Sequence, residues 1–329
     1  MAAIHEISSE GDVKLICGSE ETGDATHIIV CSAVLRHGSP VFKAMLGAKF
    51  KEGHTLATGA RLDLPLPDDD AASMLTICQI MHMRPVAPGV QTSEAFLKLA
   101  IVVHKYDCKS ALAYQIMVWM QGTQLHESDT DRLNLFISAY VLDSAADFYR
   151  LGHDVVLHNK SLSVADDVLG IDRMLKKAIT ALQAHIERVK EHTASQVGTI
   201  IKQECTGFAF TNTHYQNCNL CGCFYVSDRS NKFMGKLFES DLWPITSFTK
   251  QTLHQMCEGL SSFPTGWSES QVVCGSYCRK HCMKKDQGVL THMKHIASSI
   301  KHEAIKPCLV CVKEGHMQAR GICEKGHCN

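Results

Sequence analysis

The sequence lacks a long apolar run. None of its stretches approaches the roughly 20 consecutive apolar residues that span a bilayer, so we expect no membrane partner. The first residues, Met1 to Glu6, have neither the basic start nor the apolar centre of a secretory signal. We therefore expect an intracellular protein, nuclear or cytoplasmic. In that reducing compartment, its 16 cysteines are not expected to form a disulfide framework.

The chain also lacks an excess of charge of either sign. Its formal net charge is −1, which provides no general attraction to nucleic acid or to an anionic membrane. The charges are nevertheless unevenly distributed. Residues 1–122 carry 10 Lys and Arg against 13 Asp and Glu, whereas residues 274–329 carry 10 against 4. The front of the chain is mildly acidic and its tail is basic.

The motifs of common catalytic sites are missing as well. The sequence contains no G-x-S-x-G nucleophile turn, no glycine-rich phosphate loop and no H-E-x-x-H zinc helix. Serine, histidine and aspartate residues occur throughout, but without a spacing that would build a catalytic constellation. We predict that the protein is not an enzyme.

The most informative stretch is residues 28–52. It opens with β-branched residues, which predict a buried strand, and continues with apolar residues at helical spacing. Ser39 and Pro40 interrupt this spacing, and a serine cap followed by proline at the first position is a common helix start. The stretch therefore predicts a strand, a short helix and a second, capped helix.

This pattern resembles the BTB/POZ domain family at four successive places. They are a first strand over 11–18, the V-L-x-x-x-S-P-x-F signature over 34–42, a strand with an acidic turn over 61–70, and an L-A-x-x-x-x-K-Y-D helix over 97–108. One position departs from the family pattern, because Cys31 stands where a histidine is usual. The resemblance covers residues 10–122 and implies an α+β fold, a small sheet flanked by helices.

The resemblance also implies partners. Members of this family form homodimers and bind other proteins, among them cullin scaffolds. Cullin-binding members carry an apolar-x-Glu motif just after the second helix, where this sequence has Phe50, Lys51 and Glu52. We predict that these residues bind a partner. The alternative is that Phe50 belongs to the core and Glu52 is an ordinary surface residue.

Helical segments follow a polar linker at 123–131. Apolar residues at helical spacing predict one helical segment over 131–150 and one long amphipathic helix over 171–203. We interpret 131–204 as a helical extension on which His185 and His192 face solvent. Fungal members of the BTB/POZ family resemble this arrangement, with such an extension followed by a Cys-rich region. At the other end of the chain, residues 1–10 are polar and predicted to be loose.

Cysteine is concentrated in the last third, because twelve of the 16 fall within residues 205–329. Clusters of this kind in an intracellular chain are typical of zinc ligands. The first candidate site joins a C-x2-C knuckle to a group with helical spacing, and its ligands are Cys218, Cys221, Cys274, Cys278, His281 and Cys282. The alternative is that these thiols are free and pack as small hydrophobic groups.

A second candidate zinc site lies near the C-terminus. Cys308, Cys311, His316 and Cys323 resemble the zinc knuckle of nucleocapsid proteins, with His327 as another closing ligand. The last spacer is longer than in that family, and Leu309 stands where a base-stacking aromatic residue is usual. Residues 300–329 have too little apolar content for a core of their own, so we expect them either to need a structural metal ion, zinc, or to stay disordered.

These observations together predict a protein-interaction module. We expect it to dimerise through 10–122 and to act as a scaffold or a cullin-type ubiquitin-ligase adaptor, with 205–329 as a zinc-binding, Cys/His-rich region. The alternative is a nucleic-acid-associated transcriptional regulator that uses the basic tail. Because counterion release makes nucleic-acid binding salt-dependent, retention on a DNA column would favour the alternative.

Overall fold

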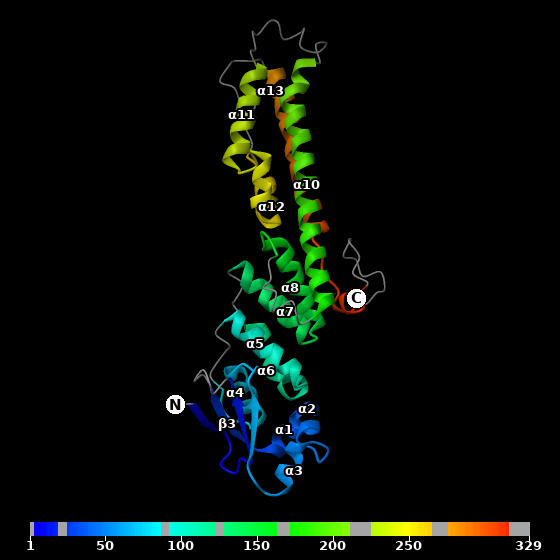
Figure 1. The fold of residues 1–329 in the computed structure, drawn as a ribbon. Helices are drawn as coiled ribbons and strands as arrows, with labels where there is room; N and C mark the ends of the chain where they lie inside the picture. The colour runs from blue at the N-terminus through cyan, green and yellow to red at the C-terminus, as the bar shows by residue number, and fades with distance from the viewer. Residues whose placement is uncertain are drawn as a thin grey trace. The chain divides into compact units, whose positions relative to one another are not determined.

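A computed structural model of the chain describes residues 3–18, 25–86, 92–122, 128–162, 172–210, 225–264 and 276–315. The chain separates into two compact units, unit 1 (Met1–Leu151) and unit 2 (Gly152–Asn329). The predicted α+β class is confirmed, because a single four-stranded mixed sheet accompanies many helices in the described ranges (Figure 1). None of these helices has the length and apolar content needed to cross a membrane.

Unit 1 contains the sheet. Its strands lie in the order β1 (Ala3–Glu6), β3 (Thr26–Val30), β2 (Val13–Cys17) and β4 (Leu62–Leu66). β2 and β3 pair antiparallel, while β1 joins β3 and β4 joins β2 in parallel. Alternate residues of β2 and β4 are buried, as a sheet with one face against the core requires. The expectation that residues 1–10 are loose was wrong for β1, because its backbone pairs with β3.

The helices of unit 1 include the short helix and the capped second helix that were predicted after the strand. They are α1 (Ser32–Gly38), α2 (Pro40–Met45), α3 (Lys51–Ala57), α4 (Ala71–Met81), α5 (Ser93–Lys105), α6 (Lys109–Gly122) and α7 (Asp129–Val141). The predicted cap of α2 is present, since the Ser39 hydroxyl accepts a hydrogen bond from the Phe42 N–H at 3.0 Å. The helical segment predicted over 131–150 is divided into α7 and α8 (Ala145–His158). Between them, Asp143 adopts a left-handed φ of 54°.

Unit 1 extends beyond residue 122 because α7 packs against α5. The Ser93 hydroxyl on α5 donates a 2.6 Å hydrogen bond to the Asp131 carboxylate on α7. From Arg132 onward, nearly every residue of α7 is buried. Phe136 of α7 also stacks on Phe148, at 4.4 Å between ring centroids. The compact unit therefore ends at Leu151, whereas the sequence pattern placed a boundary at 122.

A buried polar junction joins three of the four motifs on which the family resemblance depends. Asp69, which is 6% exposed, accepts hydrogen bonds from the Tyr106 hydroxyl at 2.6 Å and from Lys105 Nζ at 2.7 Å. The Tyr106 carbonyl in turn accepts from the Ser39 hydroxyl, and the Tyr106 ring stacks on Phe42 at 4.4 Å. The acidic turn, the end of α5 and the start of α2 therefore meet at one point.

His82 forms a second link within unit 1. Its Nε2 accepts a 3.0 Å hydrogen bond from the Cys31 backbone N–H, and its Nδ1 lies 2.8 Å from the Cys78 carbonyl oxygen. An amide N–H only donates, so Nε2 must be unprotonated and Nδ1 must carry the hydrogen. Burial first, and the charge on Arg84 as a smaller effect, lower the pKa of His82 below its usual 6.5. Neutral His82 thus ties the end of α4 to the start of α1.

Unit 2 is helical in its described residues. After α8 come α10 (Arg173–Phe210), α11 (Tyr225–Glu239), the 3-10 helix η2 (Ile245–Lys250), α12 (Leu253–Ser261), α13 (Ser276–Glu303) and α14 (Leu309–Lys313). The long helix predicted from residue 171 is confirmed as α10. Helices α11, η2, α13 and α14 all contact α10, and α12 packs on α13. Figure 1 shows α10 and α13 side by side.

The prediction that His185 faces solvent was wrong. This side chain is 7% exposed, and its Nε2 lies 2.8 Å from the carbonyl oxygen of Glu303 at the end of α13. His192, two turns along nearly the same side of α10, is exposed as predicted. The contact with Glu303 at the end of α13 decides the difference, because helical spacing alone cannot say where along α10 another segment will cover a side chain.

We predict that Tyr106→Phe destabilises unit 1 by about 1–3 kcal/mol, because it leaves one oxygen of a buried carboxylate without its donor. The ring stack on Phe42 is retained in this variant. Urea unfolding of the full chain, followed by circular dichroism, measures the change. Tyr114→Phe is the matched control, since Tyr114 is 75% exposed and should lose nothing. Equal stability of the two variants would contradict a structural role for the Tyr106–Asp69 bond.

We also predict that acid weakens the link made by His82. A histidine whose folded-state pKa is lowered stabilises the fold fully above its unfolded pKa of about 6.5, and this contribution is lost as the pH falls below that value. Hydrogen exchange at the Cys31 amide should therefore lose protection between about pH 7 and pH 5. In His82→Gln, which does not titrate, protection should stay flat with pH. An exposed control, His54→Gln, should behave like the wild type.

Candidate functional site

The predicted partner-binding residues lie at the start of α3, on a tightly packed turn. The Phe50 N–H donates to the Gly47 carbonyl at 3.1 Å, and the Phe50 carbonyl accepts from the His54 N–H at 3.2 Å. A Cβ on Gly53 would lie 2.0 Å from the Gly47 carbonyl oxygen, so only glycine fits there. The backbone of Phe50 is therefore held from both sides.

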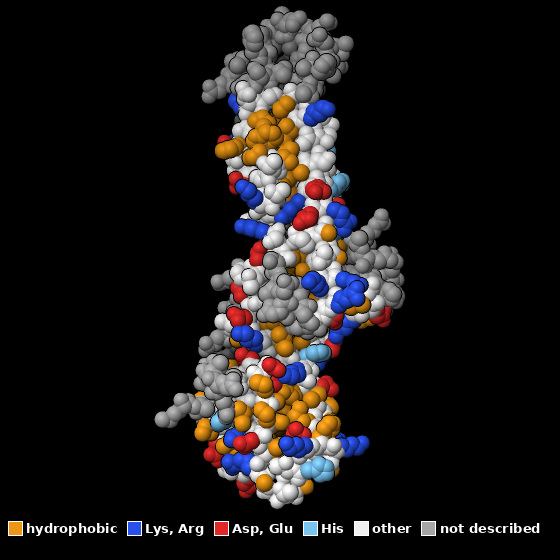
Figure 2. Space-filling model, in the orientation of Figure 1, with side chains coloured by type: hydrophobic (Ala, Val, Ile, Leu, Met, Phe, Trp, Pro, Cys, Tyr) orange, Lys and Arg blue, Asp and Glu red, His pale blue; other side chains and the backbone are white. Residues whose placement is uncertain are grey.

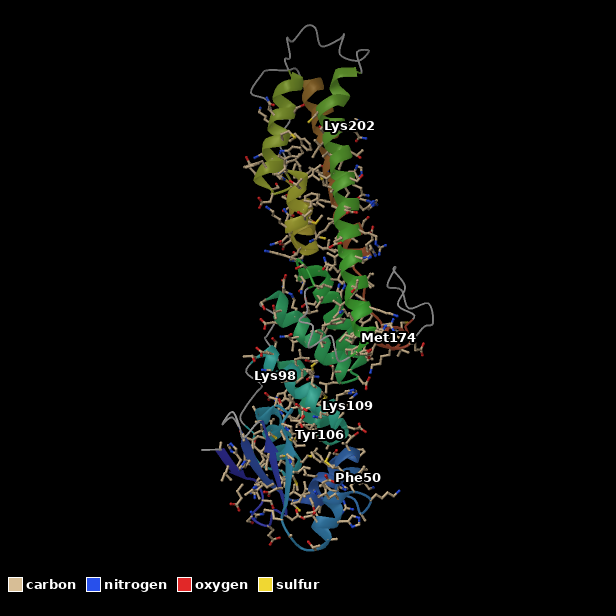
Figure 3. All side chains as sticks on the ribbon, viewed as in Figure 1. Phe50, Lys98, Tyr106, Lys109, Met174 and Lys202 are labelled. Atoms are coloured by element: carbon tan, nitrogen blue, oxygen red, sulfur yellow. The ribbon has the colours of Figure 1, made fainter. Side chains whose placement is uncertain are left out.

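The Phe50 side chain is 50% exposed, so it is not a core residue. Figure 3 shows Phe50 at the periphery of unit 1, while Tyr106 lies inside it, between the sheet and the helices. Lys51 is exposed, and Glu52 is half-buried in the first turn of α3. The structure thus places Phe50 at the N-cap of a short helix whose first two residues supply a cation and a carboxylate.

Sequence analysis missed an apolar face on α6. Tyr114, Met117 and Val118 are 75%, 47% and 41% exposed, although all three are large apolar or aromatic residues. Their spacing puts them on one side of α6, opposite Leu112 and Trp119, which are buried. Figure 2 shows hydrophobic side chains gathered on unit 1 around α6. The sequence spacing defines both apolar faces of α6, the one with Tyr114 and the one with Trp119. It does not say which of them is covered by the rest of the unit.

The buried ionisable groups near Asp69 have structural rather than catalytic properties. Burial raises the pKa of Cys17 and of Cys108 to about 12 each, and it raises that of Cys78 as well. Burial and then the hydrogen bond to Asp69 raise the pKa of Tyr106. These thiols and this phenol stay protonated at neutral pH, so they serve as packing groups and hydrogen-bond donors rather than as nucleophiles.

Among the predicted zinc ligands, the structure describes the side chains of Cys308 and Cys311 only. Cys308 is the N-cap of α14 and Cys311 lies within it, and the two are 6% and 8% exposed. Cys278, His281 and Cys282 fall within α13, as their helical spacing predicted, but their side chains lie outside the described residues. The remaining predicted ligands also lie outside them: Cys218, Cys221, Cys274, His316, Cys323 and His327.

The surroundings of Cys308 and Cys311 suit either interpretation of these thiols. Helix α14 contacts α10, and a Cβ on Gly315, just after α14, would lie 3.6 Å from the Met174 side chain on α10. In the described part of the chain, no group of three or more potential ligands could hold a metal ion. Leu309, the position of the base-stacking residue in nucleocapsid knuckles, is buried, which removes it from contact with a base.

We predict that the full chain binds about one or two zinc ions and that Cys308→Ser with Cys311→Ser lowers the zinc content. Elemental analysis of protein purified without chelator measures the content. Hydrogen exchange over 304–313 should speed up after chelation, because α14 would lose its metal anchor.

Cys257→Ser is the matched control for this prediction. Cys257 is buried in α12, its thiol donates to the Ala297 carbonyl at 3.5 Å, and burial raises its pKa to about 11. This change should lower stability and leave the zinc content as it is. Substoichiometric zinc, together with unchanged exchange after chelation, would mean that Cys308 and Cys311 are ordinary packing residues.

No protein-family model matches this sequence, and neither a curated protein nor a solved structure has significant similarity to it. We therefore infer the function from the chain's own residues and their geometry.

Proposed function

We propose that this protein is a protein-interaction module, a scaffold or cullin-type adaptor, that docks a protein partner through Phe50, Lys51 and Glu52. The observation that supports this most is a half-exposed aromatic ring on a backbone that is hydrogen-bonded on both sides. A pre-organised anchor of this kind loses little conformational freedom on binding. Its ring supplies the apolar burial that dominates interface hot spots.

The surroundings of Phe50 favour docking over a purely structural role. Exposing half of a phenylalanine ring costs part of the free energy that burial would provide, about 25 cal/mol per Å² of apolar surface. A partner that covered this ring would recover that free energy. Glu52, beside it in the first turn of α3, offers an acceptor that would orient the partner.

We also propose that residues 10–122 belong to the BTB/POZ type and self-associate. The polar junction at Asp69 supports the assignment, because it joins the acidic turn, the K-Y-D helix end and the S-P-x-F helix through direct hydrogen bonds. The antiparallel β2–β3 pair with β4 in parallel is compatible with the small flanked sheet of that family. A zinc-stabilised tail completes the proposal.

We predict that Phe50→Ala weakens partner binding by about 2 kcal/mol or more, as expected for a truncated hot-spot aromatic residue. Glu52→Ala should weaken it less. Co-purification with full-length chain as bait, quantified by mass spectrometry, measures the effect for a cullin and for any other recovered protein. Light scattering of the bait alone should give the mass of two chains.

The matched control is Tyr114→Ala, which removes another exposed aromatic ring from the same unit. Both changes are at the surface, so each should lower the free energy of unfolding by no more than about 0.5 kcal/mol. Thermal unfolding measures this change. Partner recovery that is equal for Phe50→Ala, Tyr114→Ala and wild type would reject the docking role of Phe50. A single-chain mass at tens of micromolar would reject self-association.

A further inference from the structure

The charge of residues 1–122, within unit 1, is unevenly distributed along the sequence. Residues 31–60, which form α1, α2 and α3, carry four Lys and Arg and only one acidic residue, Glu52. The other residues up to 122 carry six Lys and Arg against twelve Asp and Glu. The net positive charge within residues 1–122 is therefore confined to the segment that forms these three helices, whose surface also holds Phe50.

The cations of this surface have no ionic partner within the described part of the chain, whereas several cations elsewhere in unit 1 do. Lys14, Lys98 and Lys105 form ion pairs with Asp63, Glu94 and Asp69, at 2.7, 2.8 and 2.7 Å. The four cations of residues 31–60 are exposed and form no ion pair within the described part of the chain; they are Arg36, Lys43, Lys49 and Lys51. Their charges remain available to an approaching molecule.

The arrangement around Phe50 indicates the chemistry of that molecule. Two of the unpaired cations, Lys49 and Lys51, are its neighbours in the chain, and the ring between them is 50% exposed. Interfaces commonly bury an apolar anchor at the centre and place complementary charges at the rim. The complement of this surface is an apolar pocket with acidic residues around it.

A protein surface fits this description better than a nucleic acid does. Glu52, two residues after Phe50 in the first turn of α3, would repel a phosphate backbone. Sequence-independent binding of single strands also relies on several stacked aromatic side chains along a basic groove. Phe50 is the only aromatic residue of 31–60 that is exposed, since Phe42 is fully buried.

We propose that helices α1–α3 bind an acidic protein surface with an apolar pocket that receives Phe50, while Lys43, Lys49 and Lys51 pair with the acidic rim. This inference rests on the proposed docking function and specifies the partner's chemistry. It implies that salt weakens the complex, because exposed ion pairs are screened within about 10 Å at moderate ionic strength. It also implies that a charge reversal beside Phe50 weakens the complex without affecting the fold.

The test uses the full chain and a fluorescein-labelled amphipathic helical peptide with leucine on one face and glutamate on the other. Fluorescence anisotropy measures binding at low and moderate salt. We expect Lys51→Glu and Phe50→Ala each to weaken binding about tenfold, and added salt to weaken the wild type severalfold. The control Lys98→Glu makes the same charge change at an exposed lysine outside the surface and should bind like wild type.

Three outcomes would overturn the proposal. Equal binding of an all-glutamate peptide without leucine would show attraction to charge alone. Binding of a single-stranded oligonucleotide that Lys51→Glu abolishes and Phe50→Ala spares would assign the surface to nucleic acid. A change of chain mass in light scattering of Lys51→Glu would assign it to a second copy of this chain.

The same variants separate this proposal from the docking function. If co-purification of the partner needs Phe50 but is indifferent to Lys51→Glu and to salt, the docking function stands and the acidic partner is rejected. If neither change affects co-purification or peptide binding, both proposals fail together.

Discussion

The buried carboxylate of Asp69 is the constraint on which unit 1 depends. A charge removed from water is costly unless it is paired and hydrogen-bonded, and Lys105 and Tyr106 supply both kinds of partner. These two residues close α5, and Asp69 immediately precedes the N-cap of α4, so the requirement brings two helix ends together. The Tyr106 carbonyl extends the network to Ser39, the cap of α2.

The surface that carries Phe50 is built outward from this junction. Ser39 sets where α2 begins, and Phe42, one turn later, stacks on the Tyr106 ring. The chain then turns at Gly47, against which Gly53 packs so closely that no side chain fits. Phe50 lies between these two glycines in the chain, at the N-cap of α3, and its side chain stays half-exposed.

In unit 2, a segment with little apolar content of its own is covered by another part of the chain. The described residues after α13 include Ile305, Cys308, Leu309 and Val312, all of them buried. Their cover comes from α10, the long helix that also contacts α11, η2 and α13. The buried part of the tail therefore obtains its core from a distant segment, and the zinc proposed for it would add to this packing.

Where a signal is local, the sequence alone was sufficient. The Ser39-Pro40 start of α2, the strand that opens residues 28–52 and the periodicity of α10 are properties of neighbouring residues, and the structure confirms each. The sequence alone also placed Phe50, Lys51 and Glu52 just after the second helix. Only the tertiary structure decided the burial of His185, the pairing of β1 with β3 and the exposure of Phe50. The reason is physical: each depends on which distant segment covers one face or one edge, and a pattern of period 2 or 3.6 defines faces without saying what will cover them.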